Sequence, residues 1–114
     1  MKNPQNEAER RMSIIEVLQY TLKPGTGAAF HILMETQSIP LHQQCDVKVV
    51  KYGNSLHDAD KYYLVRSFRN ISEMENQLAH FYSNTRWKEG PREAIVNLIT
   101  DSHRVVMYDD HPFV

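Results

Sequence analysis

The chain has 114 residues, of which 41% are hydrophobic and 24% are charged, and its formal net charge is −1 at pH 7. This size and balance are typical of one folded domain and argue against a wholly disordered chain. No basic stripe is present, so nucleic acid and anionic membrane surfaces are poor candidate partners.

The cysteine content and the hydropathy pattern indicate a reducing compartment. Cys45 is the only cysteine, so an internal disulfide cannot form. No apolar run has the length of a signal peptide or of a membrane span. We therefore expect a cytoplasmic protein of bacterial type.

The amino end differs from the rest of the chain. Residues 1–12 (MKNPQNEAERRM) show no apolar period, and the first one begins near Ile14. We expect residues 1–12 to be an N-terminal extension, with Met12 as a candidate for the true start. Residues 13–114 are expected to form a single domain.

A strand and a helix are predicted first. Residues 13–22 (SIIEVLQYTL) are rich in β-branched and large apolar side chains, which favours a strand. A Lys-Pro-Gly turn ends this strand, and Pro24 suits the first turn of a helix. That helix is expected to run to about Gln37 and to be closed by Ile39-Pro40. Its apolar stripe is predicted to be Phe30, Leu33, Met34 and Gln37.

A hairpin with a long loop is predicted next. Residues 46–52 (DVKVVKY) and 61–68 (KYYLVRSF) are rich in strand-forming side chains. The polar stretch between them begins at Gly53-Asn54 and is predicted to be their connection.

Helical segments and a final strand follow. Ser72 and Glu75 match a capping box for a helix from about residue 72 to residue 82. Another helix is expected over about residues 86–99, with a bend at Gly90-Pro91, and residues 104–108 (RVVMY) are predicted to be the last strand. The apolar stripe of the first of these helices is predicted to be Ile71, Met74, Leu78 and Phe81.

The order strand, helix, strand, strand, helix, strand predicts an α+β, ferredoxin-like domain. This fold has a four-stranded antiparallel sheet with the first and third strands at its centre and helices on one face. Leu18 and Tyr20 form one apolar row of the first strand, and Ile15 and Val17 form the other. Because the helices bury one face only, we expect the second face to pack on another copy in a homodimer. A monomer with an apolar open face is the alternative.

Three stretches occur in a particular order: YTLKPGTGAAF (residues 20–30), RSFRNISEME (residues 66–75) and Trp87-Lys88-Glu89. Their order and spacing resemble those of the NIPSNAP-type domain over about residues 13–110. This family belongs to the dimeric α/β-barrel superfamily, so the resemblance implies the same fold and dimer. It implies no catalytic mechanism, since none is established for these domains.

The superfamily implies that a ligand would lie between the sheet and the helices. Its members include heme-degrading monooxygenases, cofactor-free monooxygenases and isomerases. In the heme-degrading relatives an asparagine, a tryptophan and a histidine form the site, and the matching positions here hold Leu18, Phe81 and Pro91. These departures argue against heme binding, and we expect no cofactor.

The pocket is predicted to lie between the helices and the sheet. Arg66 is either an anchor for an anionic ligand or the ion-pair partner of Glu16 on the neighbouring strand. His80 is the best candidate for a general base, and Trp87 is either a pocket wall or a core residue. The predicted lining is Tyr20, Phe30, Met34, Phe81 and Trp87, with Arg66 or His80 as polar contacts.

The spacing of the histidines and of the cysteine supports neither a metal site nor a nucleophilic cysteine. The six histidines show no metal-ligand pattern with each other or with the lone cysteine, so no metal site is expected. Cys45 follows His42 by three residues, but His42 is expected in a loop and we interpret Cys45 as structural.

Two functions of different classes therefore remain open. The first is a small-molecule-binding homodimer, either a cofactor-independent monooxygenase or an isomerase acting on an apolar or aromatic compound. The second is a non-enzymatic structural or interaction dimer whose helix–sheet gap is filled with side chains. A cavity of several hundred Å³ in that gap would favour the first. The sequence does not decide whether the protein is an enzyme.

Overall fold

The computed structural model describes residues 13–109, so the predicted N-terminal extension, residues 1–12, lies outside the described residues. The strands are β1 (Ile14–Leu22), β2 (Lys48–Asn54), β3 (Lys61–Phe68) and β4 (Ile99–Tyr108). The helices are α2 (Gly27–Leu33), the π-helical turn η1 (Met34–Ser38), α3 (Ile39–Gln44), α4 (Ile71–Ser83), α5 (Thr85–Lys88) and α6 (Arg92–Leu98).

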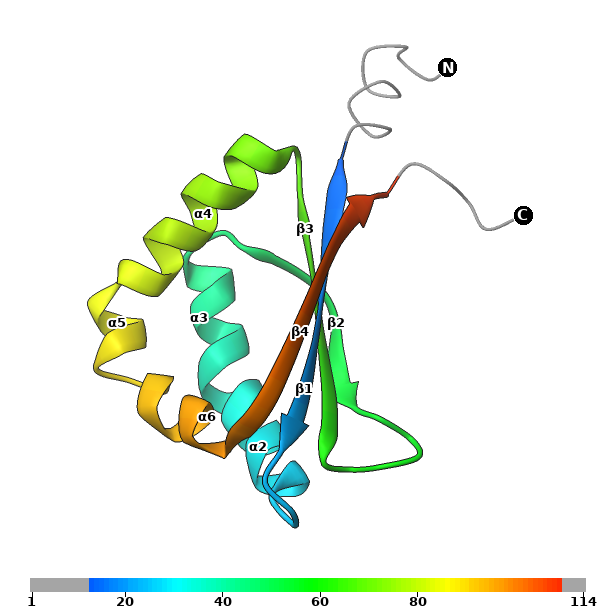
Figure 1. Cartoon of the computed structure of the whole chain (residues 1–114). Helices are drawn as coiled ribbons and strands as arrows, with labels where there is room; N and C mark the ends of the chain where they lie inside the picture. The colour runs from blue at the N-terminus through cyan, green and yellow to red at the C-terminus, as the bar shows by residue number, and fades with distance from the viewer. Residues whose placement is uncertain (1–12, 110–114) are drawn as a thin grey trace.

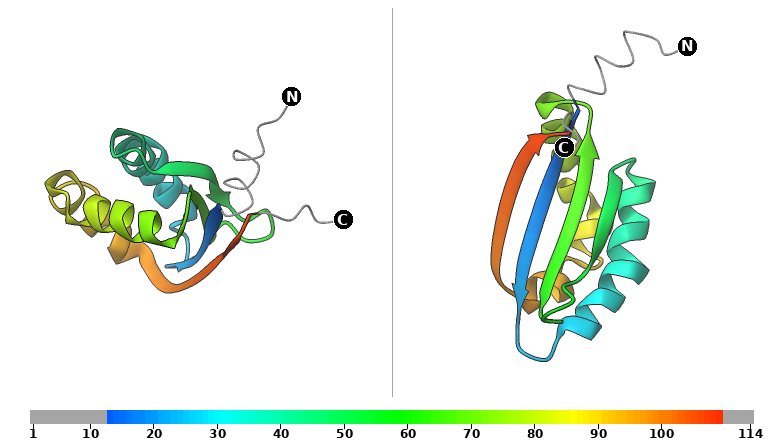
Figure 2. Two further views of the ribbon diagram at one scale, coloured as in Figure 1. Left: turned by 90° about the horizontal axis from the view of Figure 1, so that it is seen from above. Right: turned by 90° about the vertical axis from the view of Figure 1, so that its right-hand side faces the viewer.

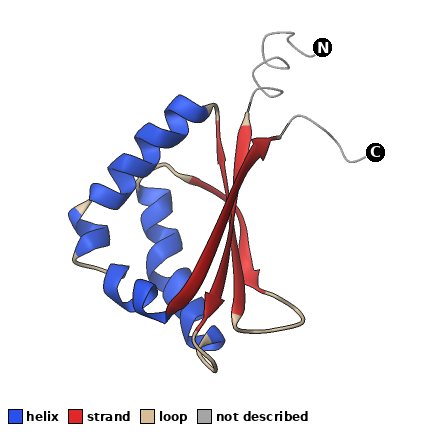
Figure 3. Cartoon of the chain, viewed as in Figure 1, coloured by secondary structure: helices blue, strands red, loops and turns tan. Residues whose placement is uncertain are grey.

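The four strands form one antiparallel sheet in the order β2-β3-β1-β4. β1 and β3 are central, as predicted, and all the helices lie against one face of the sheet (Figures 1 and 3). The predicted α+β ferredoxin-like fold is therefore confirmed.

The edge strands differ from their predicted bounds. β4 begins at Ile99 rather than at residue 104, because its polar first half pairs with β1 through Thr21 and Asp101. β2 begins at Lys48 rather than at residue 46, because Asp46 has a φ of 58° in the left-handed region. In β4, pairing with the neighbouring strand outweighs the polarity of the local sequence. In β2, the turn after α3 moves the start of the strand to Lys48.

The turn after β1 is held by the carboxylate of Asp60. This side chain accepts hydrogen bonds from the backbone N–H groups of Gly25 and Gly27, each at 2.9 Å. Gly25 has a φ of +82°, and a Cβ on Gly27 would lie 2.0 Å from the carbonyl oxygen of Ala59. Because the turn extends through Thr26, the helix begins at Gly27 instead of at Pro24.

Ile39-Pro40 does not close the first helical segment, contrary to the prediction. The chain makes a π-helical turn over Met34–Ser38 and continues as α3 to Gln44. This turn brings in one extra residue, so the buried position falls on Ser38 and not on Gln37, which is exposed. Pro40 lies in the first turn of α3, where a missing N–H is tolerated.

The predicted capping box of α4 is wrong. Asn70 is the N-cap, and its side-chain oxygen accepts a hydrogen bond from the backbone N–H of Glu73 at 2.8 Å. Ile71, the first residue of the helix, is exposed. The rest of the predicted stripe is buried: Met74, Leu78 and Phe81.

The two faces of the sheet have different surroundings. The face under the helices carries the buried residues of β1 and β3, whereas the opposite face carries partly exposed apolar side chains. No helix covers that opposite face in Figure 2, right. The open-face apolar residues are Ile15, Val17, Tyr63, Val65, Val105 and Met107. The two-sided apolar pattern read from the sequence is therefore present.

Among the described residues, no helix combines the length and the apolar character needed to cross a membrane.

Candidate functional site

A cleft of about 460 Å³ opens between the sheet and α4, on the side of β4. We call it the α4–β4 cleft. It is lined by Glu16, Leu18, Tyr20, Arg66, Leu78, Ala79, Tyr82, Ser102 and Arg104. Its volume lies within the range of roughly 300–1,000 Å³ that is typical of small-molecule sites. Aliphatic and aromatic side chains form its walls, and a cluster of charged side chains forms one end.

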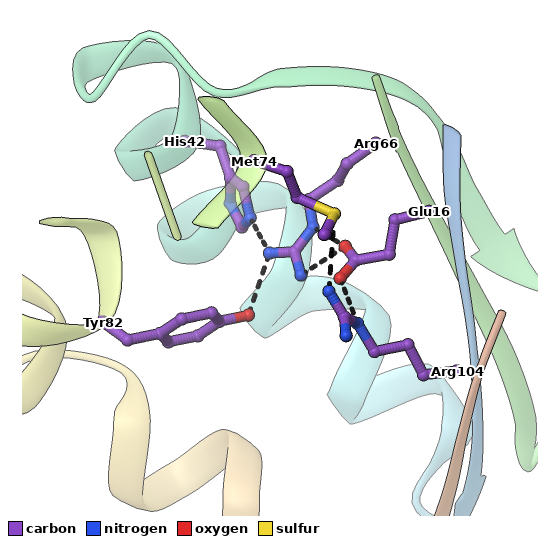
Figure 4. Close-up of polar contacts among 6 residues, drawn as sticks. All are labelled: Glu16, His42, Arg66, Met74, Tyr82 and Arg104. Atoms are coloured by element: carbon purple, nitrogen blue, oxygen red, sulfur yellow. Dashed lines mark hydrogen bonds and ion pairs between the residues drawn. The ribbon is translucent and has the colours of Figure 1, made fainter. Parts of the chain in front are cut away.

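The centre of that cluster is the carboxylate of Glu16, which lies between two guanidinium groups (Figure 4). Its Oε1 accepts a hydrogen bond from Arg66 Nε at 2.6 Å and lies 2.6 Å from Arg66 Nη2. Its Oε2 accepts a hydrogen bond from Arg104 Nε at 2.5 Å. The sheet dictates this arrangement, because Glu16 pairs directly with Arg66 while Arg104 stands opposite Leu18, one diagonal step away.

Arg66 is fully engaged by the protein. Its Nη1 donates hydrogen bonds to Tyr82 Oη at 2.8 Å and to His42 Nε2 at 3.1 Å, and its guanidinium lies 5.6 Å from the centre of the Tyr82 ring. Burial opposes its charged form, but Tyr82 and Glu16 outweigh that effect and raise the pKa of Arg66. The predicted Glu16 ion pair is formed, and Arg66 holds the cluster in place.

His42 is a neutral acceptor within the cluster. Its Nδ1 lies 2.7 Å from the backbone carbonyl oxygen of Ser38, which can only accept, so Nδ1 carries the proton. Nε2 is then free to accept from Arg66. Burial lowers the pKa of His42 to about 4, and the positive charge of Arg66 acts in the same direction. With both ring nitrogens engaged, His42 is unavailable as a general base for Cys45.

Tyr20 brings a phenol to the wall of the cleft. Burial, together with nearby Tyr82, raises the pKa of Tyr20, so its hydroxyl stays protonated at neutral pH. The ring packs edge-on against Phe30 at 5.9 Å. Among the described residues no acceptor bonds to the Tyr20 hydroxyl, which leaves it as an available donor.

The structure divides the predicted pocket residues among three places. Tyr20 and Arg66 line the α4–β4 cleft, whereas His80 is exposed on α4 next to Ala79. The other four predicted residues are buried in the core beside the cleft: Phe30, Met34, Phe81 and Trp87. Trp87 lies behind the cleft wall, because its ring packs edge-on against Tyr82 at 5.4 Å.

Sequence reasoning missed three members of the site: His42, Tyr82 and Arg104. Arg104 directly precedes the apolar stretch of the last strand, and opposite charges on neighbouring strands favour a pair with Glu16, so the charge pattern could have identified it. His42 was expected in a loop, but it lies on α3 because the helix continues through the π-helical turn. No local signal identified Tyr82, whose role depends on how α4 packs over β3.

Two other cavities are weaker candidates for a functional site than the α4–β4 cleft. One of about 630 Å³ runs along β2 and α3, and among its lining residues no charged side chain is buried. Another of about 450 Å³ lies on the open side of the sheet, where His103 pairs with Asp101 and Lys61 donates to Thr21. Within residues 13–109 no three His, Cys, Asp or Glu side chains lie close enough to hold a metal ion.

The fold is that of NIPSNAP family proteins. No protein-family model and no curated protein matches the sequence. A NIPSNAP family protein from Agrobacterium tumefaciens has a TM-score of 0.81 at 12% identity, covering 91% of this chain and 90% of its own. A NIPSNAP-like domain protein from Burkholderia xenovorans has the same TM-score and coverage at 15% identity.

More distant structures of the same fold include proposed monooxygenases. A proposed antibiotic biosynthesis monooxygenase from Nitrosomonas europaea has a TM-score of 0.64 at 9% identity, covering 82% of this chain and 95% of its own. The resemblance read from the sequence is thus confirmed for the fold, and these identities carry no residue roles.

Proposed function

We propose that the protein is a small-molecule-binding homodimer that holds an apolar or aromatic compound in the α4–β4 cleft. One observation carries the proposal: a ligand-sized cleft has apolar walls and ends on charged side chains that are already held in place by one another. Leu18 and Leu78 are the aliphatic walls, and the rings of Tyr20 and Tyr82 are the aromatic ones.

The reaction class that we propose is that of a cofactor-independent monooxygenase or, alternatively, of an isomerase. Proposed monooxygenases share the fold, although at 9% identity. The free thiol of Cys45 supports a reducing, cytoplasmic location as part of the same proposal.

Filling the cleft tests the binding proposal. Ala79 is exposed at the cleft wall on α4, so Ala79→Phe would place a ring in the space that a ligand needs. Using 2-naphthamide as a neutral aromatic probe, we expect calorimetric titration to show binding to the wild type and at least tenfold weaker binding to this variant. Ala94→Phe, on the exposed side of α6, is the matched control and should bind as the wild type does. If neither 2-naphthamide nor the corresponding acid anion, 2-naphthoate, binds to the wild type, the proposal is overturned.

The open sheet face supports the homodimer. Its partly exposed apolar residues have no cover among the described residues, and burying them would favour association by about 25 cal/mol per Å² of apolar area.

Val17→Asp would place an uncompensated charge at the centre of this face. Sedimentation at micromolar concentration should show a dimer for the wild type and a monomer for this variant. The control Val96→Asp, on α6, should stay dimeric. A wild type that sediments only as a 13.4 kDa species would refute the dimer.

The second candidate function is a non-enzymatic dimer with a filled helix–sheet gap. It is favoured by the packing of Phe30, Met34, Phe81 and Trp87, which fill the gap beside the cleft. Native mass spectrometry of freshly purified protein separates the two candidates, because a carried organic ligand supports the first and a bare dimer with no probe binding supports the second.

A further inference from the structure

We propose that the ligand of the α4–β4 cleft is an organic oxyanion on an apolar or aromatic body, and that Arg104 binds its charged oxygen. This inference rests on the proposed function and names its substrate class. The chemistry is that of an aromatic or aliphatic acid, or of a phenol or enol bound in its ionised form.

The formal charges at the end of the cleft do not cancel. Arg66 and Arg104 carry one positive charge each, and Glu16, the only acidic side chain among the cleft residues, carries one negative charge. His42 is neutral in its bonding pattern. The cluster therefore has an excess of one positive charge beside apolar walls, where a compensating anion is favoured.

The two arginines have different tasks. The side chain of Arg66 is 2% exposed and is bonded by Glu16, His42 and Tyr82, so it cannot reach a ligand without breaking the cluster. The side chain of Arg104 is 47% exposed, and Glu16 engages its Nε. Its Nη2 meets the Met74 thioether at 3.5 Å, which is a weak acceptor. Within residues 13–109 no acceptor bonds to its Nη1, so Arg104 is oriented by Glu16 and keeps donors for a ligand.

Tyr20 supplies a second donor in the same cleft. Its protonated hydroxyl has no acceptor among the described residues, and its neighbours include Arg66, Glu16 and Tyr82. Hydrogen bonds to an ionised oxygen are about twice as strong as those between neutral groups. A guanidinium and a phenol at the charged end, with Leu18 and Leu78 along the walls, therefore favour an amphipathic acid over a neutral compound of the same shape.

A pair of probes that differ in charge tests the inference. The anion 2-naphthoate and the neutral 2-naphthamide share one ring system, and calorimetric titration gives the affinity of each. We expect wild-type protein to bind 2-naphthoate at least tenfold more tightly than 2-naphthamide. Arg104→Gln should lose at least tenfold in affinity for 2-naphthoate and keep its affinity for 2-naphthamide. Arg104→Lys should keep part of the preference, and the exposed control Arg92→Gln should keep all of it.

The outcomes separate this inference from the proposed function. Equal wild-type affinity for both probes, or loss of both in Arg104→Gln when its thermal melt matches the wild type, overturns the role of Arg104 and leaves the cleft as a binding site. If neither probe binds wild-type protein, the proposed function itself fails. If the melting temperature of Arg104→Gln is lower than that of the wild type, the Tyr20→Phe variant is titrated instead. An unchanged preference for 2-naphthoate in Tyr20→Phe would count against the two-donor site.

Discussion

The layer between the sheet and the helices has two halves of opposite character. Towards β3 and α5 it is filled by aromatic rings. The ring centres of Phe81 and Trp87 are 5.4 Å apart, and those of Phe30 and Tyr62 are 4.8 Å apart. The other half holds the α4–β4 cleft and the buried ion cluster, whose charged side chains come from β1, β3 and β4. Phe30, Phe81 and Trp87 line none of the cavities described above, whereas the charged groups form one end of the cleft. The cleft therefore lies beside the aromatic packing and not within it.

Tyr82 belongs to both halves. Its ring contacts Phe81 at 4.9 Å and Trp87 at 5.4 Å, and its hydroxyl accepts a hydrogen bond from Arg66 at 2.8 Å. The aromatic half therefore positions the wall of the cleft, and the following variants separate packing from charge.

Removing the carboxylate of the cluster should have the largest effect. Glu16→Ala leaves Arg66 buried without its counter-ion, which should lower the free energy of unfolding by about 3–5 kcal/mol in urea titrations. Glu35→Ala, which breaks a partly exposed pair with His31, should lower the free energy of unfolding by less than about 1 kcal/mol. Equal costs for the two variants would contradict the burial of the cluster. Replacing Glu16 and Arg66 together by Leu and Met should restore much of the loss, because the fully buried charges are then both removed and the remaining cation, Arg104, is half exposed.

Truncating a ring in the aromatic half should lower the free energy of unfolding by a similar or slightly smaller amount, because it leaves a cavity rather than an unpaired charge. Trp87→Ala leaves a cavity beside Phe81 and Tyr82, with an expected loss of about 3–5 kcal/mol in the same urea titration. Trp87→Phe should retain most of the stability and should change 2-naphthoate affinity less than Arg104→Gln does, since Trp87 lies behind the cleft wall. The reverse order of affinity effects would place Trp87 in the site.

The buried histidine should make stability depend on pH. The pKa of His42 is about 4 in the folded protein and has its ordinary value of 6.5 when exposed. Between these values the unfolded chain binds a proton that the folded chain does not, so stability falls as the pH falls from about 6.5 to about 4. The loss should reach about 3 kcal/mol in denaturation at successive pH values.

His42→Gln should flatten that pH dependence, because glutamine does not titrate. His80→Gln removes an exposed histidine from α4 and should leave the wild-type slope unchanged. An unchanged slope in His42→Gln would assign the pH dependence to another group.

The smallest expected effect concerns the helix that the two halves share. Asn70→Ala removes the side-chain bond to the Glu73 N–H at the start of α4 and should cost about 1 kcal/mol. Ser72→Ala, at the position that the sequence suggested as the cap, should be nearly neutral. A larger loss for Ser72→Ala in thermal melts would restore the predicted capping box.

The sequence predicted most of the fold and a smaller part of the site. The order of strands and helices follows from local hydrophobic periods, and the split βαβ order then makes β1 and β3 neighbours. That adjacency was enough to predict the pair of Glu16 and Arg66. The pocket residues were harder to predict from the sequence, because periodicity marks Phe30, Phe81 and Trp87 as apolar but cannot distinguish a filled core from a cavity wall.

The α+β architecture, the two apolar sheet faces and the adjacency of Glu16 and Arg66 follow from the sequence alone, since each depends on the alternation of side chains along a strand or on the order of elements. The composition of the site depends instead on how the elements pack. One extra residue in the π-helical turn carries His42 to Arg66, and the register of β4 against β1 carries Arg104 to Glu16. Both contacts join segments that are distant along the chain, and the packing of the elements selects them rather than any local preference.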